Sequence, residues 1–210
     1  MSELTIYQYP NLSDYGTILQ IQEQFLEKRI AGTMDDTLIL CEHPPVYTVG
    51  RSRNAIQNVI SVSDVPIYEI SRGGDVTFHG PHQLVGYPIL YLKQQDVHIY
   101  LRWLEDFWMD YLWNHYQIKA HRDERNTGVW VDGKKMVAIG IALRKWVTWH
   151  GFAWNIDTDL SYFQRINPCG MSSELVTSLA EHVPEVPIMK DAMNSVQQAF
   201  SKWYREQPIS

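Results

Sequence analysis

Cysteine is the residue type in this sequence that is best suited to nucleophilic chemistry, and the chain has two cysteines. Cys169 lies between a proline and a glycine in INPCGMSSEL, before a helix predicted to begin at Ser172 or Ser173. Backbone N–H groups at a helix start favour negative charge and lower the pKa of a nearby thiol. We interpret Cys169 as a candidate thiolate nucleophile, with an inert buried cysteine as the alternative. Cys41 follows three apolar residues of a predicted strand, which indicates a core thiol.

A nucleophilic cysteine needs a group that takes its proton, and two lysines are candidates. Lys134 and Lys135 follow Asp132-Gly133, a dipeptide typical of a two-residue hairpin turn. Because side chains alternate along a strand, we expect the two lysines on opposite faces. Unless a bulge intervenes, Lys135 shares its face with the larger apolar residues Val137, Ile139 and Ile141. Burial lowers the pKa of an amine, so Lys135 is the predicted base, and two solvated lysines are the alternative.

A glycine-rich segment, SRGGDVTFHGPHQLVGYP at residues 71–88, lies between two apolar runs. Glycine lets backbone approach a ligand closely, and a plain turn needs only one such residue. We therefore interpret the segment as the wall of a pocket. His79 and His150 each precede a glycine at a predicted strand end, where an imidazole either lines a pocket or occupies a turn.

Spacing motifs for other kinds of site are missing from the sequence. It has no Cys-x-x-Cys and no His-Glu-x-x-His, so we expect no metal. It also lacks the phosphate-binding G-x-x-x-x-G-K-[ST] loop and the G-x-S-x-G nucleophile elbow. RGGDVTFHG is not a dinucleotide fingerprint.

Composition limits the class of protein. The 210 residues, 45% of them hydrophobic, are expected to form one domain with a substantial core. A net charge of −6 argues against a nucleic-acid partner, which selects for a basic surface. No apolar run is long enough to span a membrane, and no signal peptide is recognisable. These features favour a cytoplasmic protein with reduced thiols and no membrane partner.

The elements that position these residues alternate between helix and strand. Apolar spacing predicts helices over 14–30, 97–116, 173–182 and 189–205. Strands are predicted over 37–41, 45–50, 67–71, 84–92, 127–131, 134–145 and 147–157. This order indicates an α/β (α+β) protein with a mixed sheet and packed helices. The residues alone therefore permit acyl transfer on a thiol, without establishing it.

Four stretches, in order over residues 42–171, resemble the octanoyltransferase (lipoyl(octanoyl) transferase) family of protein lipoylation: EHPPVYTVGR, RGGDVTFHGPHQLVGYP, NTGVWVDGKKMVAIGI and WHGFAWNIDTDLSYFQRINPCGM. The resemblance implies a single catalytic domain, residues 1–210, with the biotin/lipoate ligase fold and a largely antiparallel mixed sheet. It also implies transfer of an octanoyl (or lipoyl) group from acyl carrier protein to a lysine of lipoyl carrier domains, which are the lipoyl domains of 2-oxoacid dehydrogenases and the glycine cleavage H protein. The resemblance further implies that this transfer is the first step of endogenous protein lipoylation and that it needs no cofactor or metal.

The same resemblance implies the site residues. Cys169 carries the acyl group as a thioester, and Lys135 is the general acid and base. The implied substrate-binding residues are Arg72, Gly73, Gly74, Asp75, Val76, Thr77, Phe78, His79, Ala138, Ile139, Gly140, Gly151, Phe152 and Ala153. The chain departs from the family's pattern at His82, where glycine is usual, and at Asp75, where glutamine is usual. The histidine puts in question a backbone conformation that glycine would allow.

Two other functions remain open from the sequence. An ATP-dependent lipoate ligase of the same fold adenylates free acid and needs no cysteine nucleophile, so Cys169 argues against it. A carrier-binding module without catalysis is the second alternative.

Overall fold

The computed structural model describes residues 4–52, 55–60, 64–167 and 173–209. The helices and strands within these ranges are β1 (Leu4–Leu12), α1 (Tyr15–Ile30), β2 (Asp36–Glu42), β3 (Val46–Val49), β4 (Ile67–Glu69), β5 (Val76–His79), β6 (Gln83–Ile89), α2 (Val97–Tyr116), β7 (Gly128–Val131), β8 (Lys134–Arg144), β9 (Val147–Asn155) and α3 (Met189–Glu206).

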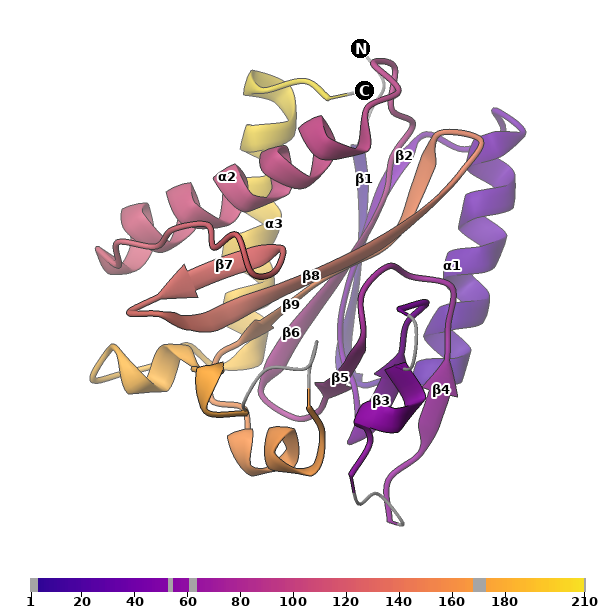
Figure 1. The fold of residues 1–210 in the computed structure, drawn as a ribbon. Coiled ribbons are helices and arrows are strands. Elements are labelled where there is room, and N and C mark those ends of the chain that lie inside the picture. Colours follow the sequence, from indigo (N-terminus) through magenta and orange to yellow (C-terminus); the bar gives the residue numbers. More distant parts are fainter. Residues whose placement is uncertain (1–3, 53–54, 61–63, 168–172, 210) are drawn as a thin grey trace.

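Two sheets organise the chain (Figure 1). The larger has the strand order β1-β2-β6-β9-β8-β7, and only β1 and β2 pair in parallel. The smaller has the order β4-β3-β5. Helices α2 and α3 pack on one face of the large sheet, and α1 packs on the other face against β6 and β9. The predicted fold class, a mixed and largely antiparallel sheet with packed helices, is confirmed.

Helix α2 shows how a local sequence pattern can predict the position of an element. Asp96 precedes it and accepts hydrogen bonds from the backbone N–H groups of His98 and Ile99. Gln117 ends it in the left-handed conformation, with φ 57°. Its apolar stripe is buried against the large sheet; removing a side chain such as Phe107 from water contributes roughly 2–3 kcal/mol. The predicted bounds, 97–116, match the helix.

Three sequence-based predictions need correction. Strands β1 and β5 were not predicted, and β5 lies inside the glycine-rich segment as the antiparallel partner of β3. The predicted helix over 173–182 is wrong, since only short 3₁₀ turns form there, at Ser173–Leu175 and Leu179–Glu181. Between the turns the backbone N–H of Thr177 donates to the carbonyl of Lys135. Pairing with β8 thus replaces helical hydrogen bonds in this segment.

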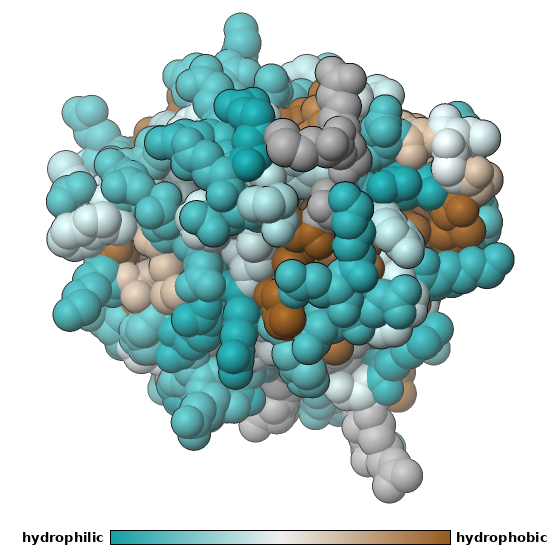
Figure 2. Space-filling model, turned by 90° about the horizontal axis from the view of Figure 1, so that it is seen from above, coloured by the Kyte–Doolittle hydropathy of each residue, from teal (hydrophilic) through white to brown (hydrophobic). Residues whose placement is uncertain are grey.

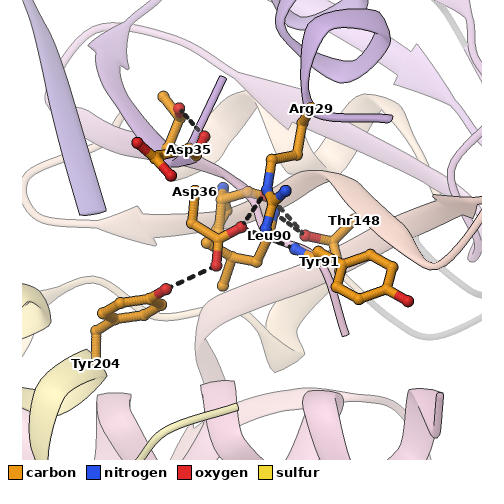
Figure 3. Close-up of polar contacts among 9 residues, drawn as sticks. Arg29, Asp35, Asp36, Leu90, Tyr91, Thr148 and Tyr204 are labelled. Carbon is orange, nitrogen blue, oxygen red and sulfur yellow. Dashed lines mark hydrogen bonds and ion pairs between the residues drawn. The ribbon is translucent and has the colours of Figure 1, made fainter. Parts of the chain in front are cut away.

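A buried carboxylate connects elements from both faces of the sheet (Figure 3). Asp36, at the start of β2, is fully buried. It accepts from Arg29 Nε of α1 at 2.6 Å, from the Tyr91 backbone N–H at 2.9 Å and from Tyr204 Oη of α3 at 2.7 Å. Because a buried charge must be compensated, this group stabilises the packing of α1 and α3 on β2.

Candidate functional site

A cavity of about 910 Å³, counting its open mouth, lies between the α1 face of the large sheet and the segment that leads into β5. All but one of the family-implied substrate-binding residues line it: Arg72, Gly73, Gly74, Asp75, Val76, Thr77, His79, Ala138, Ile139, Gly140, Gly151, Phe152 and Ala153. Phe78 does not line it, because its ring is buried against Tyr47, Tyr162 and Phe163.

Glycines allow three backbone segments to lie close together at the cavity, at residue 50, at residues 73–74 and at residue 141. The Gly73 N–H donates to the Ile141 carbonyl of β8 at 2.8 Å. Gly74 has φ +83°, a conformation that favours glycine. A side chain at Gly50 would lie 2.4 Å from the Gly74 carbonyl oxygen. The close approach that the structure shows for this segment is to other backbone around the cavity.

Arg72 places a guanidinium in the cavity wall. Its side chain is buried, and Nη2 donates to the Thr48 carbonyl at 2.8 Å and to the Thr48 hydroxyl at 3.0 Å. Nη1 donates to the Gly73 carbonyl at 3.0 Å. A Cβ at Gly140 would lie 3.0 Å from Arg72 Cδ, so glycine at that position makes room for the arginine.

Asp75 is held in place by neighbours. One carboxylate oxygen accepts from the Val76 backbone N–H at 2.7 Å, and the other accepts from Asn58 Nδ2 at 2.6 Å. Both oxygens are thus used to fix the entry into β5. Asparagine and backbone donors suit a carboxylate here, because both of its oxygens accept.

A polar chain crosses the floor of the cavity. His79 is buried, and its Nδ1 lies 2.7 Å from Gln83 Oε1. Gln83 Nε2 donates to Asn155 Oδ1 at 2.9 Å, and Asn155 Nδ2 donates to the Thr177 carbonyl at 3.0 Å. Since the Gln83 oxygen can only accept, His79 donates from Nδ1 when neutral, which leaves Nε2 as the unprotonated nitrogen. Burial, followed by the neighbouring His43, lowers the His79 pKa to about 3, so the ring is neutral at physiological pH.

Two further buried histidines lie near this chain. His43 donates from Nδ1 to the Ser13 carbonyl at 2.7 Å, and its Nε2 lies 2.9 Å from Tyr87 Oη. Burial lowers the pKa of His43 to about 4. His150 lines the cavity, and burial together with Arg72 lowers its pKa to about 3. The cavity therefore presents neutral imidazoles beside the Arg72 guanidinium.

The structure separates the two lysines of the hairpin. Lys135 is partly buried and lines the cavity; its Nζ donates to the Thr127 carbonyl at 3.1 Å and lies 5.1 Å from the centre of the Trp130 ring. Lys134 is exposed, and its Nζ lies 3.8 Å from a carboxylate oxygen of Glu181. The two lysines thus have different surroundings, as expected, although Lys135 does not share its face with Val137 as predicted.

A bulge in β8 explains that error. Val129 of β7 pairs with Val137, but the next residue, Trp130, pairs with Lys135. Met136 is left over, and Met136 and Val137 are both fully buried in the α2 side of the core. The extra residue reverses the alternation of side chains along β8. Lys135 and Ala138 therefore both line the cavity, whereas Val137 lies on the other face of the strand.

Cys169 lies outside the described residues. The chain before it is held by the Asn167 N–H, which donates to the Asn58 carbonyl at 2.8 Å. After it, Leu175 and Val176 line the cavity, and Val176 pairs with Lys135 in an isolated parallel bridge. The 3₁₀ turn at Ser173–Leu175 is too short to supply the helix-start effect predicted for a thiol.

Cys41 behaves as the predicted core thiol. It is fully buried in β2, and its Sγ lies 3.4 Å from His43 Nε2. Burial raises its pKa well above the usual range, so it stays protonated. A protonated, inaccessible thiol is a poor nucleophile.

Sequence reasoning missed several cavity residues, among them Tyr15, Gln83, Val85, Tyr87 and Asn155. Gln83 and Asn155 are polar residues within otherwise apolar strands, and that contrast was the available signal. The tyrosines carried no such signal, because a buried tyrosine is also an ordinary core residue.

Two other kinds of site were sought in the described ranges. No group of three or more histidine, cysteine, aspartate or glutamate side chains there is arranged to hold a metal ion. No helix in the same ranges is long and apolar enough to cross a membrane. The face of the molecule in Figure 2 is mostly hydrophilic, with small separate hydrophobic patches.

Two solved structures that resemble this chain are protein ligases. A bi-partite lipoate protein ligase from Thermoplasma acidophilum superposes with a TM-score of 0.71 over 97% of this chain and 84% of that one, at 16% identity. Biotin protein ligase from Aquifex aeolicus gives a TM-score of 0.54 over 99% and 72% of the two chains, at 14% identity. At these identities the likeness establishes the fold alone.

Sequence comparison establishes the family as well as the fold. Residues 14–201 match the model of the lipoyl protein ligase A/B catalytic domain. An octanoyltransferase from Caldicellulosiruptor saccharolyticus is 41% identical over 203 residues, which cover 92% of this chain and 86% of the relative. The chain therefore belongs to the lipoyl protein ligase A/B catalytic domain family and, within it, to the octanoyltransferases.

Proposed function

We propose that this octanoyltransferase, acting as one catalytic domain, moves an octanoyl group from acyl carrier protein to a lysine of a lipoyl domain. The acceptors are lipoyl domains of 2-oxoacid dehydrogenases and the glycine cleavage H protein. Cys169 carries the acyl group between the two partners, and Lys135 moves the protons. The observation that carries the proposal is the position of Lys135, whose amine lines a largely apolar, glycine-walled cavity while its neighbour Lys134 lies outside.

The first half-reaction transfers the acyl group to the enzyme. Lys135 takes the thiol proton of Cys169, and the thiolate attacks the octanoyl thioester carbonyl of the carrier's phosphopantetheine arm. A new carbon–sulfur bond forms on Cys169 as the bond to the phosphopantetheine sulfur breaks. The departing thiolate takes the proton from Lys135. The chain that flanks Cys169 supports this arrangement, because Leu175 and Val176 lie in the cavity beside Lys135.

The second half-reaction releases the product. The neutral amine of the target lysine attacks the Cys169 thioester, and an amide bond forms as the carbon–sulfur bond breaks. Lys135 accepts the proton that the attacking nitrogen loses and returns it to the Cys169 thiolate. The acyl group arrives activated as a thioester, so the reaction needs no nucleotide.

Intact-mass measurement tests the proposal most directly. Mixing the protein with octanoyl-acyl carrier protein alone, without ATP, is expected to add one octanoyl group. Cys169→Ala is expected to abolish both this adduct and transfer, whereas Cys41→Ala keeps both because Cys41 is a buried core thiol. Cys169→Ala is expected to leave the fold unchanged, which circular dichroism checks.

The alternatives predict different results. An ATP-dependent ligase transfers free octanoate only when ATP is added and needs no acyl-enzyme. A carrier-binding module retains carrier binding and shows no transfer in any variant. Normal turnover by Cys169→Ala would rule out the acyl-enzyme.

A further inference from the structure

A row of small side chains crosses the floor of the cavity from one strand to the next. Ala138 of β8 pairs with Ala153 of β9, and Ala153 pairs with Val85 of β6. All three line the cavity. The next partner in the row, Cys41 of β2, is fully buried and does not line it. The row is therefore a trough that ends at β6.

Burial gives the trough a direction. At the β8 end, Lys135, Ala138 and Val176 are partly exposed. At the β6 end, Val85 is 1% exposed and Tyr87 is 3% exposed. A substrate thus enters from the β8 side, and its tail lies toward β6.

Two tyrosines close the buried end. Tyr87 lies two residues after Val85 on the same face of β6, and Tyr15 comes from the first turn of α1. The Tyr87 hydroxyl lies 2.9 Å from His43 Nε2, and His43 is anchored to the Ser13 carbonyl. The Tyr15 ring centre lies 5.2 Å from that of His43 and 6.1 Å from that of His79. The contact between its hydroxyl and His43 favours one orientation of the Tyr87 ring and opposes its displacement by a longer ligand.

The row of small side chains is about as long as an acyl chain of eight carbons. From Ala138 of β8 to Val85 of β6 there are two inter-strand spacings, which together measure about 9.6 Å, and Tyr87 lies beside the Val85 end, two residues further along β6. An eight-carbon chain in the extended, staggered form spans roughly 9 Å. We propose that Tyr87 and Tyr15 form the end wall of the acyl slot and that Tyr87, positioned by His43, sets the acyl-length limit near eight carbons. This inference rests on the proposed function, since it takes the thioester carbonyl to lie beside Lys135.

The test is a chain-length profile measured with the full-length protein. Acyl-pantetheine thioesters of six, eight, ten and twelve carbons are the donors, a lipoyl domain is the acceptor, and kcat/KM is obtained from thiol release. The parent is expected to prefer eight carbons and to fall steeply at ten. Tyr87→Leu opens space for two or more carbons and is expected to raise the ten-to-eight ratio of kcat/KM at least tenfold, since each buried methylene contributes roughly fourfold. Tyr87→Phe keeps the ring but loses the contact with His43 that orients it, and it is expected to raise the same ratio by a smaller factor than Tyr87→Leu.

A matched control removes the same ring elsewhere. Tyr100 of α2 is fully buried on the opposite face of the large sheet, so Tyr100→Leu is expected to lower stability without changing the ratio.

A second variant shortens the slot where Tyr87→Leu lengthens it, and it is less disruptive to the fold. Ala153→Val fills the middle of the trough and is expected to move the preference from eight carbons to six or fewer.

The possible negative results contradict different parts of the proposal. If Tyr87→Leu folds and keeps the parent profile, the end wall is wrong. If Tyr87→Leu fails to fold, Ala153→Val decides, and an unchanged preference there overturns the direction of the slot and with it the wall. A parent that transfers no acyl group of any length contradicts the proposed function itself, and the end wall fails with it.

Discussion

At the scale of single residues, the environment of each lysine separates two neighbours of identical chemistry. Lys134 lies in solvent beside Glu181, where an ion pair contributes little. Lys135 lies in the cavity, where its Nζ donates to the Thr127 carbonyl. A group that exchanges protons with a ligand must reach it, and only the second lysine meets that condition.

Replacing the two lysines separately tests this distinction. Lys135→Ala is expected to lower kcat/KM for octanoyl transfer by about 100-fold or more, the usual contribution of a general acid and base. Lys134→Ala is expected to change it less than about threefold, because exposed pairs are weak. The thiolate fraction of Cys169, measured as the rate of alkylation against pH, is expected to drop only in the Lys135 variant. Equal effects of the two changes would show that Lys135 has no special role.

His82 carries backbone strain that glycine would remove. Its φ is +62°, while its N–H donates to Glu42 at 2.6 Å and its exposed side chain makes no packing contribution to the core. The left-handed conformation costs roughly 1–2 kcal/mol in a residue with a side chain. Replacing His82 by glycine removes this cost. The replacement also raises the conformational entropy of the unfolded chain, which lowers the free energy of unfolding by roughly 0.5–1 kcal/mol.

We therefore expect His82→Gly to raise the free energy of unfolding by about 0.5 kcal/mol. His82→Val, which is branched at Cβ, is expected to lower it by more than about 1 kcal/mol. Urea denaturation measures both. A destabilised glycine variant would mean that the histidine side chain stabilises the turn by contacts of its own.

At the scale of elements, α3 is held to the sheet by a polar contact as well as by its apolar face. Tyr204 lies in the last turns of α3 and donates to the buried Asp36 carboxylate at 2.7 Å. The same carboxylate accepts from Arg29 of α1, so one group fixes both helices (Figure 3). Loss of a donor would leave the buried charge less well compensated.

Tyr204→Phe is accordingly expected to lower the free energy of unfolding by about 2 kcal/mol, the range for a hydrogen bond to a charged group. Amide hydrogen exchange in the C-terminal half of α3 is expected to become faster, because local opening loses the same contact. Tyr7→Phe is the control, since the Tyr7 side chain is 37% exposed, and its effect is expected to stay below about 0.5 kcal/mol. Similar losses in both variants would argue against a special role of the Asp36 contact.

At the scale of the whole molecule, three buried histidines couple stability to pH. Burial is the first cause in each case, and it lowers the pKa of His43 to about 4 and those of His79 and His150 to about 3. The nearby cations Arg72 and Arg51 add to the effect at His150. The unfolded chain, whose histidine pKa is about 6.5, therefore binds more protons than the folded chain between pH 3 and 6.5.

Stability is thus expected to be constant between pH 7 and 8 and to fall as the pH drops below 6.5. Each histidine contributes up to about 2 kcal/mol of that loss at pH 5. Urea denaturation at pH 5, 6, 7 and 8 measures the slope, and His43→Gln is expected to make it shallower. Greater stability at pH 5 than at pH 7 would contradict neutral burial of these rings.

The amino-acid sequence by itself determined the features that depend on near neighbours along the chain. Helix α2 follows from its apolar period and its capping residue, and the β7–β8 hairpin follows from Asp132-Gly133, whose φ angles of 49° and 77° suit the predicted turn. The core position of Cys41 follows from the apolar run of β2. The four motifs identified the family, because ordered stretches of sequence carry that information directly.

Only the tertiary structure decided which chemical environment each site residue occupies. Strand β5 exists because β3 pairs with it, and residues 176–177 leave the helical pattern because β8 pairs with them. The bulge at Met136 turns Lys135 toward the cavity and away from the neighbours that simple alternation assigned to it. The end wall at Tyr87 depends on His43, which is 44 residues away in sequence. Strand pairing and burial are set by segments distant along the chain, and local residue patterns carry no record of those partners.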